Sequence, residues 1–374
     1  MSNQLRIAYD ARFSIGHYRG MGRYLRALIA GREKHLLGLC ASGEYDSDLR
    51  LVADGARFYP LWEQFSIPRL VRQRGIDVLI SPYNTAPLML PRETRLILIV
   101  HDLIFLEPLP QSHSRYQNAG RLYRRLVAPG AIARADLIVT VSKFTAASLA
   151  SHFDVPQQRL RIIPNTLGKE WYETGPGTAA PGDYVLAVTG EAPSKNLMCA
   201  LRAFALCRSR TGCGSLRMKV AGVKAPFHQE FAQYAQSIGV GRFVEFLGYV
   251  SDQEMRSLYR GANVLLMPSL SEGFGIPVLE AMAIGTPVAT SRAASLPEVG
   301  GEAALYFDPT SAEHMSEILH QSIFEPGLRA RMVELGRIQA RKFHPDAVGA
   351  SIHKFWDELA QVDEPVPARE LAAC

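Results

Sequence analysis

Short aliphatic runs alternate with longer amphipathic segments along most of this chain. Because the runs are continuous rather than interleaved with polar residues, they are typical of strands covered on both faces in a parallel sheet. The first half contains six such runs, at 5–9, 35–39, 77–80, 96–100, 137–141 and 160–163. Segments with helical spacing lie between them, notably at 22–31, 116–134 and 143–153. This order predicts βαβ units.

A stretch rich in glycine and proline, 173–183, interrupts the pattern and indicates a linker. Aliphatic runs then resume at 184–188, 216–221, 243–246, 264–267, 287–289 and 304–307. We therefore expect an α/β fold of two Rossmann-like, doubly wound parallel-sheet domains, 1–175 and 183–344, that face a central cleft. A final helical pattern at 345–361 is expected to cross back onto the first domain, and the tail 362–374 to fray.

The composition narrows the class of protein. A length of 374 residues suits two domains, and 47% hydrophobic with 21% charged residues excludes disorder, collagen and a disulfide scaffold. The net charge of +5 suits anionic ligands without indicating a nucleic-acid-binding protein. Five scattered cysteines favour a reducing compartment, and we expect neither a secretory signal nor a membrane-spanning run. We expect a cytoplasmic protein that is soluble or attached to the inner face of the cytoplasmic membrane.

The strongest candidate site is the segment 268–282, which follows a predicted strand and opens a helical pattern. Pro277 falls in the expected first turn of that helix, where its missing N–H is not needed. Gly273 and Gly275 leave backbone N–H groups bare at the helix N-terminus. Such an end carries partial positive charge and suits an anion.

Two carboxylates flank this glycine loop. Glu272 lies in the loop and Glu280 lies about one turn into the helix, so they can bind different parts of one ligand. Carboxylates accept hydrogen bonds from paired hydroxyls, which favours a polyol. The alternative is that Glu272 caps the helix and Glu280 is surface charge.

The segment 272–280 resembles the E-x7-E motif of the retaining family-four glycosyltransferases, which have the two-domain GT-B fold. Further blocks look like the bacterial polysaccharide mannosyltransferase-like branch of that family: Gly20-Met21-Gly22-Arg23-Tyr24, His101-Asp102-Leu103, Ala135-Asp136 with 141–144, Ile163-Pro164-Asn165, and 290–299 followed by 303–309. The resemblance implies that Glu280 holds the ribose of a nucleotide sugar. It also implies that Glu272 and the backbone of Gly273, Phe274, Gly275 and Ile276 contact the donor's sugar hydroxyls and phosphate.

Lys195 and Asn196 form a second candidate donor-binding site, at the start of a helical pattern. A lysine there can neutralise a departing diphosphate. Where the family usually shows Arg-Lys-Asn, this chain has Ser194 before Lys195, so one cation is missing. Either another basic residue compensates, with Arg292 a candidate, or catalysis is slower than in relatives. The other interpretation of Lys195 is an ordinary lysine at a helix N-terminus.

His101 and Asp102 directly follow the run 96–100, at the carboxyl end of a predicted strand. A lone histidine is more often buried and satisfied in a core. In the family that this chain resembles, a histidine here lies beside the anomeric carbon and contacts the transferred sugar, which implies that role for His101. We place both residues in the candidate catalytic site.

Glycines after two predicted strands complete the candidate nucleotide-sugar site. Gly20 and Gly22 lack the third glycine of the dinucleotide fingerprint, but their place allows backbone contact with phosphate or acceptor. Gly190 ends the first predicted strand of the second domain.

Other patterns predict no site. Asp46-Ser47-Asp48 matches a D-x-D metal motif but falls in a polar loop, where we expect it to be solvated. Cys207 and Cys213 lack the partners of a zinc site. We therefore expect no metal and no cofactor. The arginine-rich segment 115–134 predicts either a basic amphipathic helix on anionic lipid or a helix with a charged outer face.

The resemblance implies a retaining, metal-independent hexosyltransferase. Mannose, carried by GDP-mannose, is the preferred sugar, and the acceptor is a hydroxyl of a lipid-linked oligosaccharide or surface polysaccharide such as lipopolysaccharide. Polyprenyl-diphosphate-linked acceptors of the family favour peripheral membrane contact. Two alternatives stay open: a GT-B phosphorylase, and a degenerate sugar-nucleotide-binding or scaffold protein without transfer activity, which Ser194 suggests.

Overall fold

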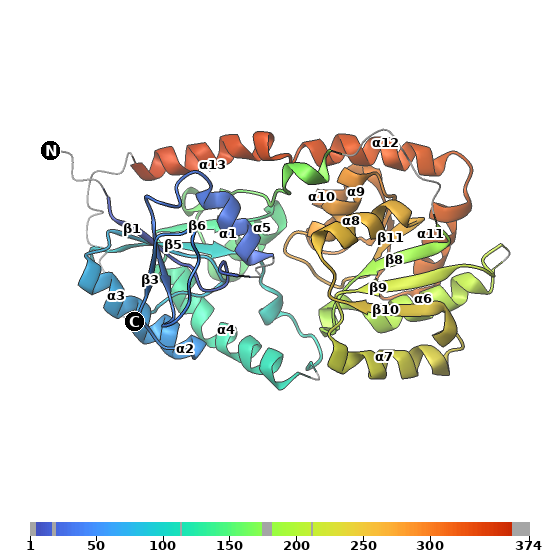
Figure 1. Ribbon diagram of the computed structural model, residues 1–374, viewed down its shortest axis with the longest axis horizontal. Helices are drawn as coiled ribbons and strands as arrows, with labels where there is room; N and C mark the ends of the chain where they lie inside the picture. The colour runs from blue at the N-terminus through green and yellow to red at the C-terminus, as the bar shows by residue number, and fades with distance from the viewer. Residues whose placement is uncertain (1–4, 17–19, 113, 174–181, 211, 361–374) are drawn as a thin grey trace.

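The computed structural model describes residues 5–16, 20–112, 114–173, 182–210 and 212–360. They form two α/β domains, each built on a parallel sheet with helices on both faces (Figure 1). The predicted fold class is confirmed. Most of the predicted linker 173–183 and the whole predicted tail 362–374 lie outside the described residues.

The N-terminal sheet has seven strands in the order β3-β2-β1-β4-β5-β6-β7. The strands are β1 (Ile7–Asp10), β2 (Leu37–Cys40), β3 (Leu51–Ala53), β4 (Val78–Ser81), β5 (Arg95–Val100), β6 (Leu137–Thr140) and β7 (Leu160–Ile162). The helices and turns are α1 (Met21–Ile29), α2 (Tyr59–Leu61), the π-helical turn η1 (Trp62–Ser66), α3 (Ile67–Arg74), η2 (Ile104–Leu106), α4 (Arg115–Arg134), α5 (Lys143–Phe153), η3 (Gln157–Arg159) and η4 (Lys169–Trp171).

The C-terminal sheet has six strands in the order β10-β9-β8-β11-β12-β13. The strands are β8 (Tyr184–Val188), β9 (Arg217–Ala221), β10 (Val244–Gly248), β11 (Val264–Met267), β12 (Val288–Ser291) and β13 (Ala304–Phe307). The helices and turns are η5 (Pro193–Lys195), α6 (Leu197–Arg208), α7 (Ala225–Ser237), η6 (Gly241–Phe243), α8 (Asp252–Gly261), α9 (Ile276–Ile284), α10 (Leu296–Gly300), η7 (Gly301–Ala303), α11 (Ala312–Phe324), α12 (Leu328–Arg341) and α13 (Pro345–Ala360).

Strand β11 shows why the aliphatic runs predicted buried strands. All four of its residues are buried. Leu265 and Met267 pack into one hydrophobic cluster, whereas Val264 and Leu266 pack into another, on the opposite face. Successive side chains of a strand point to opposite faces, so a strand covered on both sides needs apolar residues at every position.

Helix α13 returns from the C-terminal domain and lies along the N-terminal domain, as predicted (Figure 1). The indole Nε1 of Trp356 donates a hydrogen bond to the carbonyl of Leu28 in α1, at 2.8 Å. Glu358 forms an ion pair with Arg161 of β7, at 2.7 Å. Phe355 and Leu359 are buried in a hydrophobic cluster that contains residues of both domains. This helix therefore ties the two domains together.

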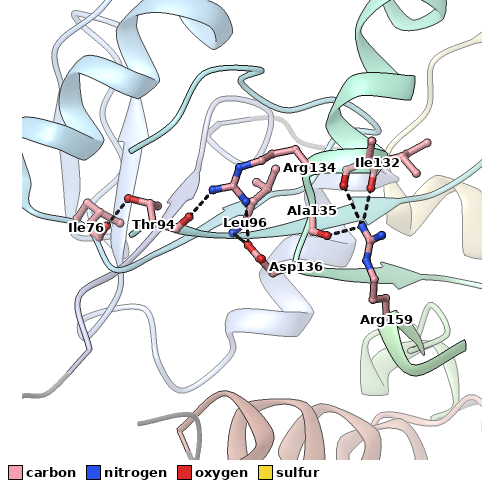
Figure 2. Close-up of polar contacts among 9 residues, drawn as sticks. Ile76, Thr94, Leu96, Ile132, Arg134, Ala135, Asp136 and Arg159 are labelled. Atoms are coloured by element: carbon pink, nitrogen blue, oxygen red, sulfur yellow. Dashed lines mark hydrogen bonds and ion pairs between the residues drawn. The ribbon is translucent and has the colours of Figure 1, made fainter. Parts of the chain in front are cut away.

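Arg134, the last residue of α4, and Arg159 of η3 bond to carbonyl groups at the ends of neighbouring elements, as Figure 2 shows. Arg134 donates to the carbonyl of Thr94 at 2.8 Å and pairs with Asp136 at 3.0 Å. Arg159 donates to the carbonyls of Ile132, at 2.7 Å, and Ala135. The bonds from Arg159 satisfy carbonyl groups at the C-terminus of α4.

The outer face of α4 carries both charged and apolar side chains. Arg115 and Arg125 are exposed, although Arg121 and Arg125 also donate to backbone carbonyls of the preceding loop, those of Leu109 and Phe105 among them. Tyr116, Leu122 and Leu126 of the same helix are exposed as well. Both interpretations of this helix stay open. Among the described helices, none combines the length and the apolar character that crossing a bilayer requires.

Candidate functional site

The predicted glycine loop joins β11 to α9, and Ser295 bonds to its backbone. Gly275 is the N-cap of α9 and has a φ of 104°, a conformation that favours glycine. A Cβ there would also meet Leu296 at 2.6 Å. The hydroxyl of Ser295 donates to the carbonyls of Glu272, at 2.8 Å, and Phe274, at 3.0 Å. These bonds use the loop's carbonyl groups, and Ile276, the first residue of α9, lines the larger cleft described below.

Phe274 and Pro277 have structural roles in the loop. The Phe274 ring is buried and packs edge-on against Phe343, with 5.4 Å between ring centroids. Only its backbone is available to a ligand, which agrees with the backbone role that the resemblance implied. Pro277 lies in the first turn of α9, as predicted.

Lys195 and Glu272 form one unit across the C-terminal domain. The ammonium of Lys195 lies 2.6 Å from Oε1 of Glu272, and the Ser269 hydroxyl donates to the same oxygen at 2.7 Å. Glu272 therefore does not cap α9: the N-cap is Gly275, and no side chain caps this helix end. Lys195 is likewise not an ordinary surface lysine, because it is paired with the glycine loop.

Asn196 holds the loops around this pair. Its side-chain amide donates to the carbonyls of Pro268, at 3.0 Å, and Pro309, at 2.8 Å. Both amide hydrogens are thereby used within the protein. Contact of Asn196 with a nucleotide sugar stays a prediction, and the contacts in this structure make it a positioning residue.

Glu280 is a buried carboxylate, only 7% exposed, so the alternative of a surface charge is wrong. The hydroxyl of Tyr259 donates to Oε2 at 2.9 Å, and Nη1 of Arg23 lies 3.7 Å from Oε1. Burial raises the pKa of Glu280 to about 7, although the Tyr259 bond and the Arg23 charge lower it in part. Tyr259 was not singled out in the sequence, because no motif marks it.

His101 is buried at the carboxyl end of β5 and is held in one tautomer. Its Nε2–H donates to the carbonyl of Pro82 at 2.9 Å, and its backbone N–H donates to Asn84 at 2.7 Å. Nδ1 is then the acceptor of a neutral ring. Burial lowers the pKa of His101 to about 4, so the ring stays uncharged at neutral pH. One ring nitrogen of His101 is thus satisfied within the N-terminal domain, as is usual for a buried histidine, and its contact with the transferred sugar stays a prediction.

The two domains meet at Gly273. A Cβ on this residue would lie 2.1 Å from the carbonyl oxygen of His101 and 3.0 Å from the Cβ of Asp102. Only glycine permits this approach. The structure therefore brings the predicted residues Glu272, His101 and Asp102 together across the cleft. Burial raises the pKa of Asp102, and the nearby charge of Glu272 raises it further.

A pocket of about 210 Å³ lies beside this contact. Its lining includes the carboxylates of Asp102, Glu107 and Glu272 and the hydroxyls of Ser148 and Ser271. The Ser271 hydroxyl donates to Glu107 at 2.5 Å, which links the two domains again. Such a wall offers many acceptors to hydroxyl groups and repels anions.

A second, larger cleft of about 1260 Å³ opens between α1, α8, α13 and the loop 165–171. Arg23, Arg26, Arg32 and Arg256 are among its lining residues. Arg23 also forms an ion pair with Asp252, the first residue of α8. In the sequence Arg23 stands out only as part of a motif and Asp252 not at all, because 229 residues separate the two partners.

Gly20 and Gly22 stand at the start of α1, which begins at Met21. Gly20 is the N-cap with a φ of 39°, and Gly22 is buried inside the helix. Gly190 follows β8, and a Cβ there would meet Lys195 at an ordinary 4.0 Å. Ligand contact at these three glycines stays a prediction.

One expectation about charged residues needs correction. Asp48 is exposed, as expected, but Asp46 is partly buried and forms an ion pair with Arg26. The guanidinium of Arg292 lies over the ring of Tyr306, 5.0 Å from its centroid, and its role as a second phosphate cation stays a prediction. Among the described residues, no three His, Cys, Asp or Glu side chains are grouped as metal ligands would be.

Comparison with known proteins finds a glycosyltransferase family for each half of the chain. Residues 20–167 match the family described as Glycosyltransferase Family 4, and residues 177–339 match Glycosyl transferases group 1. The chain is 31% identical over 222 residues to O-antigen chain mannosyltransferase B of Escherichia coli, covering 56% of this chain and 57% of that protein. It is 28% identical over 206 residues to the MMP alpha-(1->4)-mannosyltransferase of Mycolicibacterium hassiacum, covering 54% and 49%. The chain thus spans about half the length of these curated relatives.

Solved structures share the fold over nearly the whole chain. Sucrose-phosphate synthase of Thermosynechococcus elongatus has a TM-score of 0.75 at 18% identity, covering 95% of this chain and 99% of that one. HepE of Anabaena in complex with UDP-glucose has a TM-score of 0.72 at 18% identity, covering 95% and 100%. At this identity the likeness shows the fold alone.

Proposed function

The chain belongs to the group 1 and family 4 glycosyltransferases, and from this premise we propose that it transfers a hexose from a nucleotide-diphosphate sugar to an acceptor hydroxyl, with retention of configuration. Mannose is the preferred sugar and GDP-mannose the preferred donor, because mannosyltransferases are among the relatives. The observation that carries the proposal is the contact of Gly273 with His101, which joins the Glu272–Lys195 pair to the end of β5.

The C-terminal domain would hold the donor. Glu280 accepts hydrogen bonds from the ribose hydroxyls, and the N–H groups at the start of α9 bind the diphosphate. Lys195 stabilises the charge that develops on the leaving diphosphate. An ammonium has three hydrogens, so Lys195 can hold Glu272 and a phosphate oxygen at once.

His101 would position the transferred sugar rather than donate a proton, since its ring is neutral. We assign no covalent nucleophile among the carboxylates. The acceptor oxygen forms the new bond to the anomeric carbon while the bond from that carbon to the phosphate oxygen breaks. The acceptor's proton passes to the leaving phosphate on the same face of the sugar.

The acceptor would present an uncharged sugar hydroxyl to the pocket of about 210 Å³. Asp102, Glu107 and Glu272 accept hydrogen bonds from sugar hydroxyls and would repel a phosphate at the same place. A lipid-linked oligosaccharide or a surface polysaccharide such as lipopolysaccharide fits this requirement. The exposed apolar side chains on α4 support contact with the inner face of the cytoplasmic membrane, where a lipid-linked acceptor would lie.

The test uses GDP-mannose, UDP-glucose and UDP-N-acetylglucosamine. One of them is expected to raise the unfolding temperature, because a ligand that binds the folded state stabilises it. The same donor should then yield a glycosylated product with a saccharide acceptor. A donor that binds without transfer or slow hydrolysis would favour the alternative of a non-catalytic sugar-nucleotide-binding protein. Consumption of inorganic phosphate would favour a phosphorylase.

A further inference from the structure

Arg23 lies between two carboxylates of the opposite domain. It stands in the first turn of α1, its Nη2 pairs with Asp252 of α8, and its Nη1 lies 3.7 Å from Oε1 of Glu280 in α9. A guanidinium is always charged and presents a planar fork of donors. The N-terminal domain thus delivers a cation beside the carboxylate that would hold the donor's ribose.

The contacts of Arg23 in this structure can be exchanged easily. The Arg23 and Asp252 side chains are 35% and 49% exposed, and ion pairs this exposed contribute little to stability. The distance of 3.7 Å to Glu280 exceeds a hydrogen bond, so a ribose hydroxyl can bond to Oε1 while Arg23 stays near. A phosphate offers the guanidinium stronger, charge-assisted and bidentate hydrogen bonds.

Where the resemblance implies an arginine beside the diphosphate, the chain has Ser194, and its side chain is buried. Lys195 shares its charge with Glu272, and Arg292 lies over Tyr306. Ribose and diphosphate are adjacent in the donor, so the arginine nearest to Glu280 is well placed to meet the phosphate groups.

We propose that Arg23 binds the donor's diphosphate, moving from Asp252 and Glu280 to phosphate oxygens and so replacing the arginine missing at position 194. This inference rests on the proposed function, because it assumes a nucleotide-sugar donor. It makes the start of α1 a donor-binding element contributed by the N-terminal domain. Donor binding then draws the two domains together.

The test measures binding of GDP and UDP against guanosine and uridine by calorimetry. Arg23→Gln is expected to weaken binding of the preferred diphosphate by roughly tenfold or more, since it removes charge-assisted hydrogen bonds, while nucleoside binding changes little. The affinity of Arg23→Lys for the diphosphate should lie between those of the wild type and Arg23→Gln. Arg69→Gln is the matched control, because Arg69 also forms an exposed ion pair, with Asp54, and this variant should bind both ligands as the wild type does. Unfolding temperatures check that each variant is folded.

Asp252→Asn distinguishes two roles of Arg23: binding phosphate, or only holding the two domains together through its ion pair with Asp252. If Arg23 binds phosphate, Asp252→Asn releases the cation and should leave diphosphate binding unchanged or tighter. If Arg23 acts only through its pair with Asp252, both variants weaken binding alike, and the proposal is overturned. Unchanged diphosphate binding in Arg23→Gln overturns it as well. Failure of the wild type to bind any nucleoside diphosphate would instead overturn the proposed function, and this inference with it.

Discussion

Lys195 and Glu272 come from loops 77 residues apart, yet their side chains lie 2.6 Å apart. Each would serve the same donor, Lys195 at the diphosphate and Glu272 at the sugar. Groups so close are coupled, and the effects of changing them do not add. The pair is therefore best tested as a unit.

Lys195→Ala and Glu272→Ala are each expected to lower kcat by at least about tenfold, because each removes a charge that positions or stabilises the reacting groups. The double variant should lose less than the product of the two single losses. Steady-state kinetics on variants with unchanged unfolding temperature measures this. Normal turnover in either single variant would remove that residue from the mechanism.

Glu280 makes stability depend on pH. Its pKa of about 7 in the folded protein exceeds its ordinary value of 4.5, so the folded state binds the proton more tightly. The resulting contribution to the free energy of unfolding is fully present below about pH 4.5 and is lost as the pH rises through about 7. Burial raises the pKa of Asp10 to about 7 too, so two carboxyl groups act in the same direction.

Glu280→Gln should reduce the fall in stability between pH 4.5 and pH 7 by on the order of 3 kcal/mol at most. Denaturant unfolding at several pH values measures the slope. Asp10→Asn is the matched control, because it should flatten the slope similarly while nucleotide affinity stays unchanged; Glu280→Gln alone should weaken nucleotide binding. A wild-type slope in Glu280→Gln would contradict the assignment.

At the scale of elements, the glycine loop before α9 must approach the end of β5 closely. Gly273→Ala would place a methyl group 2.1 Å from the His101 carbonyl, so one of the two elements must move. We expect kcat to fall by about tenfold or more, with a smaller change in nucleotide affinity, because catalysis depends on alignment across the cleft. Gly214→Ala is the control, since a Cβ there meets nothing within 4 Å. Equal kinetics for the two variants would argue against a catalytic contact.

The strands could be predicted from the sequence because burial on both faces demands continuous aliphatic runs. Strand β3 was missed, since Leu51–Ala53 is short, lies at the edge of the sheet and is only partly buried. The bonds from the arginines of α4 to the preceding loop were not predicted, because periodicity gives a helix face but not the backbone carbonyls that an arginine can reach.

The site itself was predictable only in part. Glu272, Glu280, Lys195 and His101 follow strands, so their place at the cleft could be expected. Partners such as Tyr259 for Glu280 depend on how helices pack, which spacing along the chain does not reveal. The carboxylate-rich pocket needed the domains in their relative positions, because its lining comes from both.

At the scale of the whole molecule, polar bonds hold the two domains against one another. Glu298 of α10 accepts from the backbone N–H groups of Lys143, at 2.8 Å, and Phe144, at 3.3 Å, at the start of α5. Thr166 donates to the carbonyl of Phe343 at 2.7 Å. A donor and an acceptor that reach the cleft would therefore require the domains to open and close. A hinge at 173–183 stays a prediction, because most of that segment lies outside the described residues.

Transfer is expected to be independent of divalent metal. Positive charge for the leaving diphosphate would come from Lys195, Arg23 and the N–H groups at the start of α9. Excess EDTA should leave the initial rate of sugar transfer within about twofold of the untreated enzyme. Removing a group that stabilises the transition state would lower the rate much more. Loss of activity on EDTA treatment, restored by magnesium or manganese, would contradict this expectation.

The most direct measurement is a crystal structure of the protein with its nucleotide-sugar donor. We predict diphosphate oxygens within hydrogen-bond distance of the N–H groups at the start of α9 and of Lys195, with the ribose hydroxyls on Glu280. A donor bound elsewhere, or an α9 N-terminus that the donor leaves unoccupied, would contradict the account.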